Sequence, residues 1–289
     1  MKLKWRMTAV TMLLGVFIFS HTAFAKTLIV KGSNAMLDMG KKMGERYSKD
    51  RPDITIQWTG GGSGVGIAAL LNITVDLAAV SRPMKEKELN KAKTAGLSPT
   101  GVAVARDALA IVVNQSNPVQ TLSVSQVEGI LTGRITRWNE VGGPDNAITC
   151  YVRESGSIAY RFVKENILKD HDSSPDSKTV QSDNEMVDAV NGDPNGIGYA
   201  NVTFLKNDSR LKVLAIKKED ASSAVSPLKS DHSLNFGAIL SDQYPIVRSL
   251  YLYTALQNAE PDVKTFLEWT LEPEGQKIVK ESGFISVKG

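Results

Sequence analysis

Length, composition and charge exclude several classes of protein. The chain has 289 residues with 34 Lys or Arg and 31 Asp or Glu, and its first 25 residues hold three of the basic residues and no acidic one. The remainder is neutral overall, which argues against the basic surface of a nucleic-acid-binding protein. The single cysteine, Cys150, excludes an intrachain disulfide and a cysteine-based metal cluster, and we expect it to be a small buried hydrophobic residue.

The first 25 residues are predicted to be a secretory signal peptide. A basic start precedes the uncharged, largely apolar run from Met7 to Ser20, and Ala23-Phe24-Ala25 supplies the A-x-A pattern of a signal-peptidase site. Residue 26 is a lysine, which indicates no lipid anchor, and no later stretch reaches the ~20 apolar residues of a membrane-spanning helix. We expect cleavage after Ala25 and a soluble periplasmic product.

Strands and helices alternate along both halves of the remaining chain. Strands are expected at Thr27–Gly32, Asp53–Trp58 and Asp76–Ser81, and helices at Met36–Ser48, Val65–Leu71 and about 84–95. A long β-rich stretch is expected at 101–114, followed by a helix near 124–131, a strand at Ile148–Val152 and a helix near 157–168. A further strand is expected within 191–200, and a polar surface loop at 217–232. The chain then has a strand at Arg248–Thr254 and helices from Pro261 and Pro273. The pattern predicts two α/β lobes with largely parallel strands around a cleft.

Small polar residues stand at several predicted strand-to-helix junctions. Ser33 and Asn34 follow the first strand, and the glycine-rich run "TGGGSGVG", which contains Ser63 and Gly64, follows the second. In the second lobe, "RESGS" follows the strand at Ile148–Val152. Unpaired N–H groups and the dipole of a helix N-terminus favour an anion at such places, and glycines let the backbone approach it closely.

Each of these residues also has an ordinary structural explanation. Ser63 and Ser157 could serve only as helix N-caps, and Arg153 could form a surface ion pair. Asp76, a carboxylate beside an apolar strand that ends in Ser81 and Arg82, is explained equally well by function and by a structural ion pair.

The known enzyme motifs with glycine-rich loops do not fit the run at Gly60–Gly66. Ile67 stands where a P-loop needs lysine, and Val65 and Ile67 stand where a dinucleotide-binding motif needs glycine. A nucleophile elbow around Ser63 also needs glycine at Val65. Beyond the signal peptide, the two histidines lie in polar, loop-like sequence, so a histidine-supported nucleophile is not indicated. We predict that the chain is not an enzyme and uses no metal or cofactor.

With these residues assembled, the chain resembles the periplasmic phosphate-binding proteins that feed the phosphate ABC importer (the PstS family). The similarity covers almost the whole predicted mature chain and rests on "KGSNAM", "GGGSGVGIAALL", "VDLAAVSRPM", "NGIGYAN" and "LEPEGQKIVKESGFISV". It implies a type II periplasmic-binding-protein fold with a ligand cleft between two lobes. Lobe I would comprise 26–112 and 246–289, and lobe II 113–245. It also implies a monomer that closes around one inorganic phosphate and docks on a membrane permease.

The resemblance implies which residues bind the anion. Arg153 would form a charge-assisted bond to phosphate, which an arginine can make in bidentate geometry. Asp76 would accept the proton that phosphate retains near neutral pH, and would repel sulfate, which has no such proton. The full implied site is Ser33, Asn34, Ser63, Gly64, Asp76, Arg153, Gly156 and Ser157.

The chain departs from the family pattern in "RESGSIAYRF". Ile158 and Ala159 stand where glycine and threonine are expected, so one hydroxyl donor is missing and an apolar side chain is added. A related oxyanion (a phosphate ester, a phosphonate or sulfate) is therefore an alternative ligand. A non-transport interaction or sensor protein that reuses the fold is a further alternative.

Overall fold

The computed structural model of the protein describes residues 26–206, 208–219, 222–255 and 260–288. The predicted signal peptide, residues 1–25, lies outside the described residues. Within the described part, no helix is long and apolar enough to cross a membrane.

One mixed sheet extends through both halves of the described structure. Its strand order is β2-β1-β3-β11-β4-β8-β6-β7, and β9 also pairs with β4. The three strands β1, β2 and β3 are parallel, as are β6, β7 and β8. Their bounds are β1 Lys26–Gly32, β2 Ile54–Thr59, β3 Leu77–Val80, β6 Thr149–Arg153, β7 Lys178–Val180, β8 Gly196–Asn201, β9 Leu211–Val213 and β11 Val247–Thr254. A separate pair joins β5 (Thr121–Ser123) and β10 (Ala215–Lys217).

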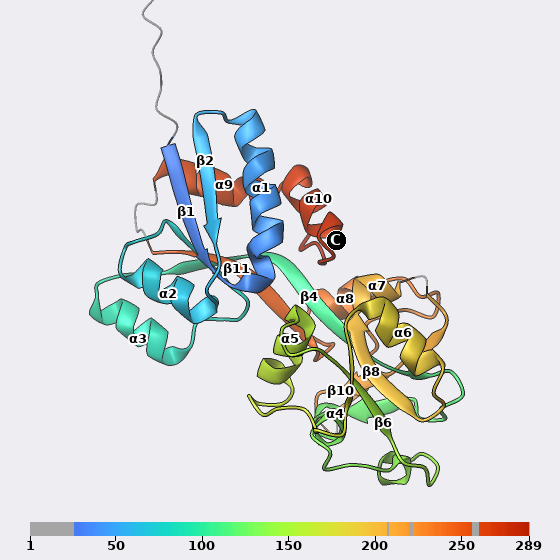
Figure 1. Ribbon diagram of the computed structural model, residues 1–289. Helices are drawn as coiled ribbons and strands as arrows, with labels where there is room; N and C mark the ends of the chain where they lie inside the picture. The colour runs from blue at the N-terminus through green and yellow to red at the C-terminus, as the bar shows by residue number, and fades with distance from the viewer. Residues whose placement is uncertain (1–25, 207, 220–221, 256–259, 289) are drawn as a thin grey trace, which may run out of the picture.

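The long strand β4 (Thr100–Asn114) belongs to both halves of the molecule. Its first part pairs antiparallel with β11, from Thr100 to Ala108, and its second part pairs with β8, from Leu109 to Val113. The second part is fully buried because helices cover both faces of the sheet there, which explains its continuous apolar sequence. In Figure 1, β4 and β11 pass side by side from one half to the other.

The half that contains β1, β2 and β3 is lobe I. One face of its sheet packs against α1 (Leu37–Asp50), α9 (Pro261–Thr270) and α10 (Pro273–Glu281), and the other against α2 (Ser63–Leu71), with α3 (Glu86–Thr94) alongside. The methionines of α1 and the aromatic residues of α9 lie in the first core, and Ile67 and Leu70 of α2 in the second. The short helix η1 (Asn34–Met36) leads into α1.

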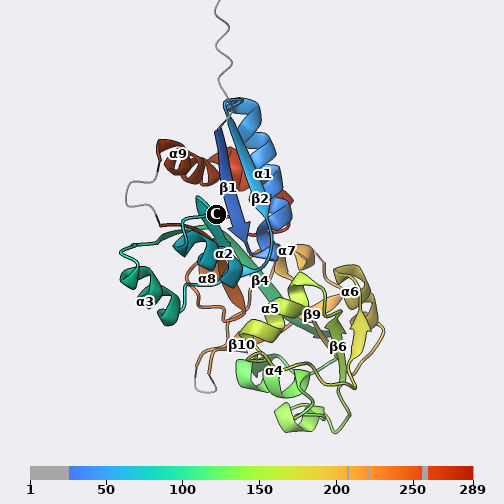
Figure 2. The same cartoon turned by 60° about the vertical axis from the view of Figure 1, so that its left-hand side comes forward.

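The half that contains β6, β7 and β8 is lobe II. Helices α4 (Val124–Leu131) and α5 (Ile158–Asn166) cover one face of its sheet, and α6 (Asp183–Asn191) and α7 (Val202–Leu205) cover the other. α8 (Phe236–Leu240) contributes to both cores, and η2 (Trp138–Val141) contributes the fully buried Trp138. In Figure 1 the helices of lobe I and those of lobe II form separate groups with β4 between them, and the turned view keeps α1 and α9 at one end and α4 and α6 at the other (Figure 2).

The predicted α/β class and two-lobed organisation agree with this architecture. The packing passes from the cores of lobe I to those of lobe II between Ala105 and Ala108, a few residues before the predicted boundary at 112/113. The predicted lobe boundaries themselves stay a prediction. Half-buried Cys150 packs against the α4–α5 core, and burial raises the pKa of its thiol to about 11, so the thiol is protonated and unreactive at neutral pH.

Candidate functional site

Three serines of lobe I converge at the carboxyl ends of three parallel strands. Ser33 follows β1, Ser63 opens α2 after β2, and Ser81 follows β3. All three line one cavity of about 60 Å³, together with Asn34 and Gly62. Such a volume is far below the ~300 Å³ at which pockets for drug-sized molecules begin, so the cavity suits a small ligand.

Two of the three hydroxyl protons of this serine cluster have no partner among the described residues, because only one of them joins Ser63 to Ser81. The Ser63 hydroxyl accepts a hydrogen bond from the Ser81 N–H at 3.1 Å and lies 3.1 Å from the Ser81 hydroxyl. Ser63 is the first residue of α2 and not its N-cap, which is Gly62. Ser33 is 6 % exposed, and its hydroxyl makes no hydrogen bond to another residue that the structure describes. The N-cap explanation therefore does not apply to Ser63.

The glycine run shapes the end of β2 and the start of α2. Gly61 and Gly62 have φ angles of +124° and +96°, which side chains other than glycine rarely adopt. The Gly62 N–H donates to the Gly32 carbonyl at 2.8 Å, and a Cβ on Gly66 would lie 2.4 Å from the carbonyl oxygen of Lys31. The glycines thus let α2 begin directly against the end of β1. They place Ser63 beside Ser33.

Asn34 and Gly64 contribute differently from each other. The Asn34 side-chain oxygen accepts a hydrogen bond from the Gly61 N–H at 2.9 Å, so it holds the glycine run while lining the cavity. Gly64 lies exposed in the first turn of α2 and is not among the described residues that line the cavity.

The predicted residues of lobe II line a second, larger cavity. Arg153, Gly156 and Ser157 border a space of about 770 Å³ that reaches the 282–284 segment of lobe I. Ser157 is the N-cap of α5, and its hydroxyl accepts from the Tyr160 N–H at 3.0 Å, so its O–H can still donate. Ile158, with 40 % of its surface exposed, lines both cavities. The two groups of predicted residues therefore meet at Ile158.

Arg153 forms a half-buried ion pair at the edge of the larger cavity. Its guanidinium donates to the Asp183 carboxylate at 2.6 Å and to the Gln181 carbonyl at 2.8 Å. Burial raises the pKa of Asp183 even though Arg153 opposes that effect. The Arg153 Nε is buried and has no partner among the described residues, so one donor of the guanidinium is left unpaired.

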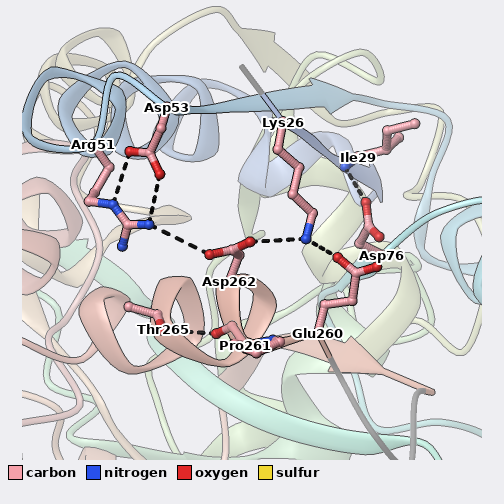
Figure 3. Close-up of polar contacts among 9 residues, drawn as sticks. All are labelled: Lys26, Ile29, Arg51, Asp53, Asp76, Glu260, Pro261, Asp262 and Thr265. Carbon is pink, nitrogen blue, oxygen red and sulfur yellow. Dashed lines mark hydrogen bonds and ion pairs between the residues drawn. The ribbon is translucent and has the colours of Figure 1, made fainter. Parts of the chain in front are cut away.

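The structure separates Asp76 from every other predicted site residue. Asp76 precedes β3, whereas Ser81 follows it, and five residues of strand span about 16 Å. Its carboxylate accepts a hydrogen bond from the Ile29 N–H at 2.7 Å. Figure 3 shows it beside the ion pair of Lys26 with Glu260, at the far end of β1. The role predicted for Asp76 is therefore corrected to a structural one, because the carboxylate caps a sheet N–H away from both cavities.

Four polar residues that line the serine cavity were not in the site predicted from the sequence, although Ser81 was noted at its strand end. These are Ser81, Arg161, Glu165 and Arg248. Ser81 had a usable signal, because ligands of α/β folds bind at the carboxyl ends of strands and Ser81 is the first residue after one. Arg248 is buried inside β11, where its only sequence signal is a charge in an apolar strand.

Replacing Asp76 by asparagine is expected to leave phosphate affinity and the preference over sulfate unchanged within about twofold. The asparagine oxygen still accepts from Ile29, and neither cavity changes. Ser81→Ala, by contrast, is expected to weaken phosphate binding about 10-fold or more, because a hydrogen bond to a charged ligand contributes ~1.5–3 kcal/mol. Isothermal titration calorimetry of both variants checks this. A 10-fold change in the preference for phosphate over sulfate in Asp76→Asn would show that Asp76 does take part in ligand binding.

The described residues contain no group of three or more His, Cys, Asp or Glu arranged to hold a metal ion. Arginines, serines and helix N-termini between two lobes instead form a setting for a small anion.

Comparison with known proteins agrees with this geometry. Residues 20–274 match the model of a PBP superfamily domain. The chain is 28% identical over 270 residues to the phosphate-binding protein PstS of Pseudomonas aeruginosa, covering 88% of this chain and 81% of the relative. It is 26% identical over 263 residues to protein SphX of Synechococcus elongatus, covering 88% and 75%.

Solved structures give the same result. An ABC-type phosphate transport receptor from Vibrio cholerae superposes with a TM-score of 0.75 at 26% identity, covering 90% of this chain and 99% of that chain. PstS from Borrelia burgdorferi superposes with a TM-score of 0.76 at 26% identity, covering 90% and 98%. These relatives are binding proteins and not enzymes, as predicted for this chain. The chain belongs to the PBP superfamily, with phosphate-binding proteins of ABC transport among its relatives.

Proposed function

We propose that the protein is a periplasmic solute-binding protein that captures inorganic phosphate between its lobes and delivers it to the permease of an ABC importer. The observation that carries this proposal is the convergence of Ser33, Ser63 and Ser81 on one small cavity that lobe II closes. The relatives named as phosphate-binding proteins support the same ligand. The predicted signal peptide supports export, and we propose that the mature protein acts as a monomer.

Capture would proceed by closure of the lobes. The serine cluster lies in lobe I, and Arg153 with the N-terminus of α5 lies in lobe II, so the two walls can approach about the shared strands β4 and β11. Closure would add the free donors of Arg153 and the first N–H groups of α5 to the serine hydroxyls. The N-termini of α2 and α5 would both stabilise the anion.

Sulfate becomes the first competitor to test. Asp76 lines neither cavity, so its carboxylate does not repel sulfate there. Selectivity for phosphate must then come from other groups of the cleft.

A phosphate ester is the second candidate ligand. Ile158 presents an apolar side chain where the two cavities meet, and Phe204 and Phe284 line the larger one. A volume of about 770 Å³ is large enough for an organic substituent on the phosphate.

A thermal-shift panel on residues 26–289 tests the proposed function. Phosphate, sulfate, methylphosphonate and glycerol phosphate would each be added at millimolar concentration. A ligand at 100 times its Kd adds about 2.7 kcal/mol of stability, which raises the Tm by several degrees. The proposal expects the largest shift with phosphate. No shift with phosphate would overturn it, and a shift with glycerol phosphate alone would favour the ester.

A further inference from the structure

A buried ion pair lies where the chain crosses between the lobes. Asp107 of β4 and Arg248 of β11 are direct partners in the antiparallel register. Arg248 Nε and Nη2 donate to the same carboxylate oxygen of Asp107, Oδ2, at 2.9 and 2.8 Å. The side chains are only 5% and 3% exposed. A buried charge needs a partner of opposite charge, and here each residue is the partner of the other. We call this part of β4 and β11 the hinge, because the proposed closure of the lobes turns about these two strands.

The pair borders both cavities of the cleft. Arg248 lines the cavity of the serine cluster with Ser33, Ser63 and Ser81. Asp107 lines the larger cavity, on the side of Arg153. The cation of the pair is thus on the side where the hydroxyl donors converge, and the carboxylate is on the other side.

Arg248 retains hydrogen-bonding capacity toward the serine cluster. Both of its bonds to Asp107 use one edge of the guanidinium, and Nη1 has no hydrogen-bond partner among the described residues. Arg153, the cation predicted from the sequence, lines only the larger cavity and gives two donors to Asp183 and Gln181. Arg161 lines the serine cavity but is exposed on α5, where solvent screens its charge.

Packing fixes the orientation of Arg248. Its guanidinium carbon lies 4.4 Å from the ring centroid of Phe162, on α5 of lobe II. Asp107 is held in turn by the Asn201 side chain, which donates to its second oxygen at 3.4 Å. A guanidinium that is paired on one edge and stacked on an aromatic ring is preorganised, so little order is lost when its free edge binds an anion.

We propose that Arg248 is a ligand-contacting residue that donates from Nη1 to the oxyanion held by the serine cluster, with Asp107 and Phe162 holding it in place. This inference rests on the proposed function and adds a hinge residue to the site. The anion would then touch lobe I, lobe II and the hinge together, so that binding would favour the closed arrangement through a contact at the axis of closure.

The test compares two matched Arg–Asp pairs on neighbouring positions of β4. In the first variant, Arg248→Gln and Asp107→Asn replace the hinge pair by two amides that can still bond to each other. In the control, Arg106→Gln and Asp242→Asn do the same to the pair that Arg106 forms at 2.7 Å, and Arg106 lines neither cavity. A third variant, Arg248→Lys, keeps the charge. Calorimetric titrations of residues 26–289 with phosphate and with sulfate give the affinities, and thermal melts establish that each variant is folded.

The hinge variant is expected to lose about 10- to 100-fold in phosphate affinity, the control to stay within threefold, and Arg248→Lys to lie between the two. A folded hinge variant that binds phosphate within threefold of the unmodified chain overturns the inference. If the hinge variant does not fold, Arg248→Lys decides, because unchanged affinity there also overturns it. If the unmodified chain binds sulfate and not phosphate, the proposed function fails. The sulfate affinities of the hinge variant, the control and Arg248→Lys then show whether Arg248 contacts the anion. If it binds neither anion, both proposals fail.

Discussion

Replacing Ile158 by glycine together with Ala159 by threonine is expected to tighten phosphate binding about 10- to 100-fold. The threonine adds a hydroxyl donor in the first turn of α5, and a hydrogen bond to a charged ligand contributes ~1.5–3 kcal/mol. The glycine removes the side chain that stands where the two cavities meet. The expected cost is small, because glycine at an exposed helix position destabilises by about 1 kcal/mol.

Calorimetric titration with phosphate measures this gain. Ile73→Gly is a control for the loss of an exposed isoleucine side chain, since Ile73 lines neither cavity; its φ of +56° means that glycine there costs no backbone strain. Its variant should bind phosphate as the unmodified chain does. An equal or weaker affinity in the double variant would show that Ile158 and Ala159 belong to the native recognition of a different ligand, such as a phosphate ester.

Replacing Arg248 by methionine alone is expected to destabilise the protein by about 3–5 kcal/mol, because Asp107 is left charged and buried without a partner. Adding Asp107→Leu should restore most of the lost stability, since apolar residues of similar size can replace a buried ion pair. Urea denaturation gives both free energies of unfolding.

Arg137→Met provides the comparison for an exposed pair. Arg137 and Asp145 are 47% and 70% exposed, and such pairs contribute at most about 1 kcal/mol. If Arg248→Met were no more destabilising than Arg137→Met, Asp107 would not depend on Arg248 as a buried charge depends on its partner.

Much of the fold could be predicted because its signals are local. A short β-prone run marks β1, the alternation of apolar residues marks β2, and the apolar run marks the second half of β4. The glycine run was predicted to let the backbone approach an anion closely, and that stays a prediction; the structure shows a close approach between Gly66 of α2 and the Lys31 carbonyl. The three-residue strands β7 and β9 were not predicted, because so short a segment carries no measurable periodicity.

The site was predicted less completely because two of its determinants are not local. Asp76 was predicted instead of Ser81 because a carboxylate can accept the phosphate proton. Asp76 precedes β3, however, and Ser81 follows it, so only Ser81 lies at the carboxyl end of the strand. The pairing of Asp107 with Arg248 joins residues 141 positions apart, so it depends on the antiparallel register of two strands that the sequence does not align. Ser33 and Ser63, by contrast, were found because Ser33 directly follows a strand and Ser63 stands in the recognisable glycine-rich run after the next one.

A crystal structure of residues 26–289 grown with phosphate tests the central claim most directly, which is that the serine cluster of lobe I and the α5 wall of lobe II hold one anion between them. We expect a single phosphate within hydrogen-bonding distance of Ser33, Ser63 and Ser81, with the lobes closed so that Arg153 also reaches it. A phosphate bound outside the cleft, or a cleft that stays empty at saturating phosphate, would show that these two walls do not form one anion site.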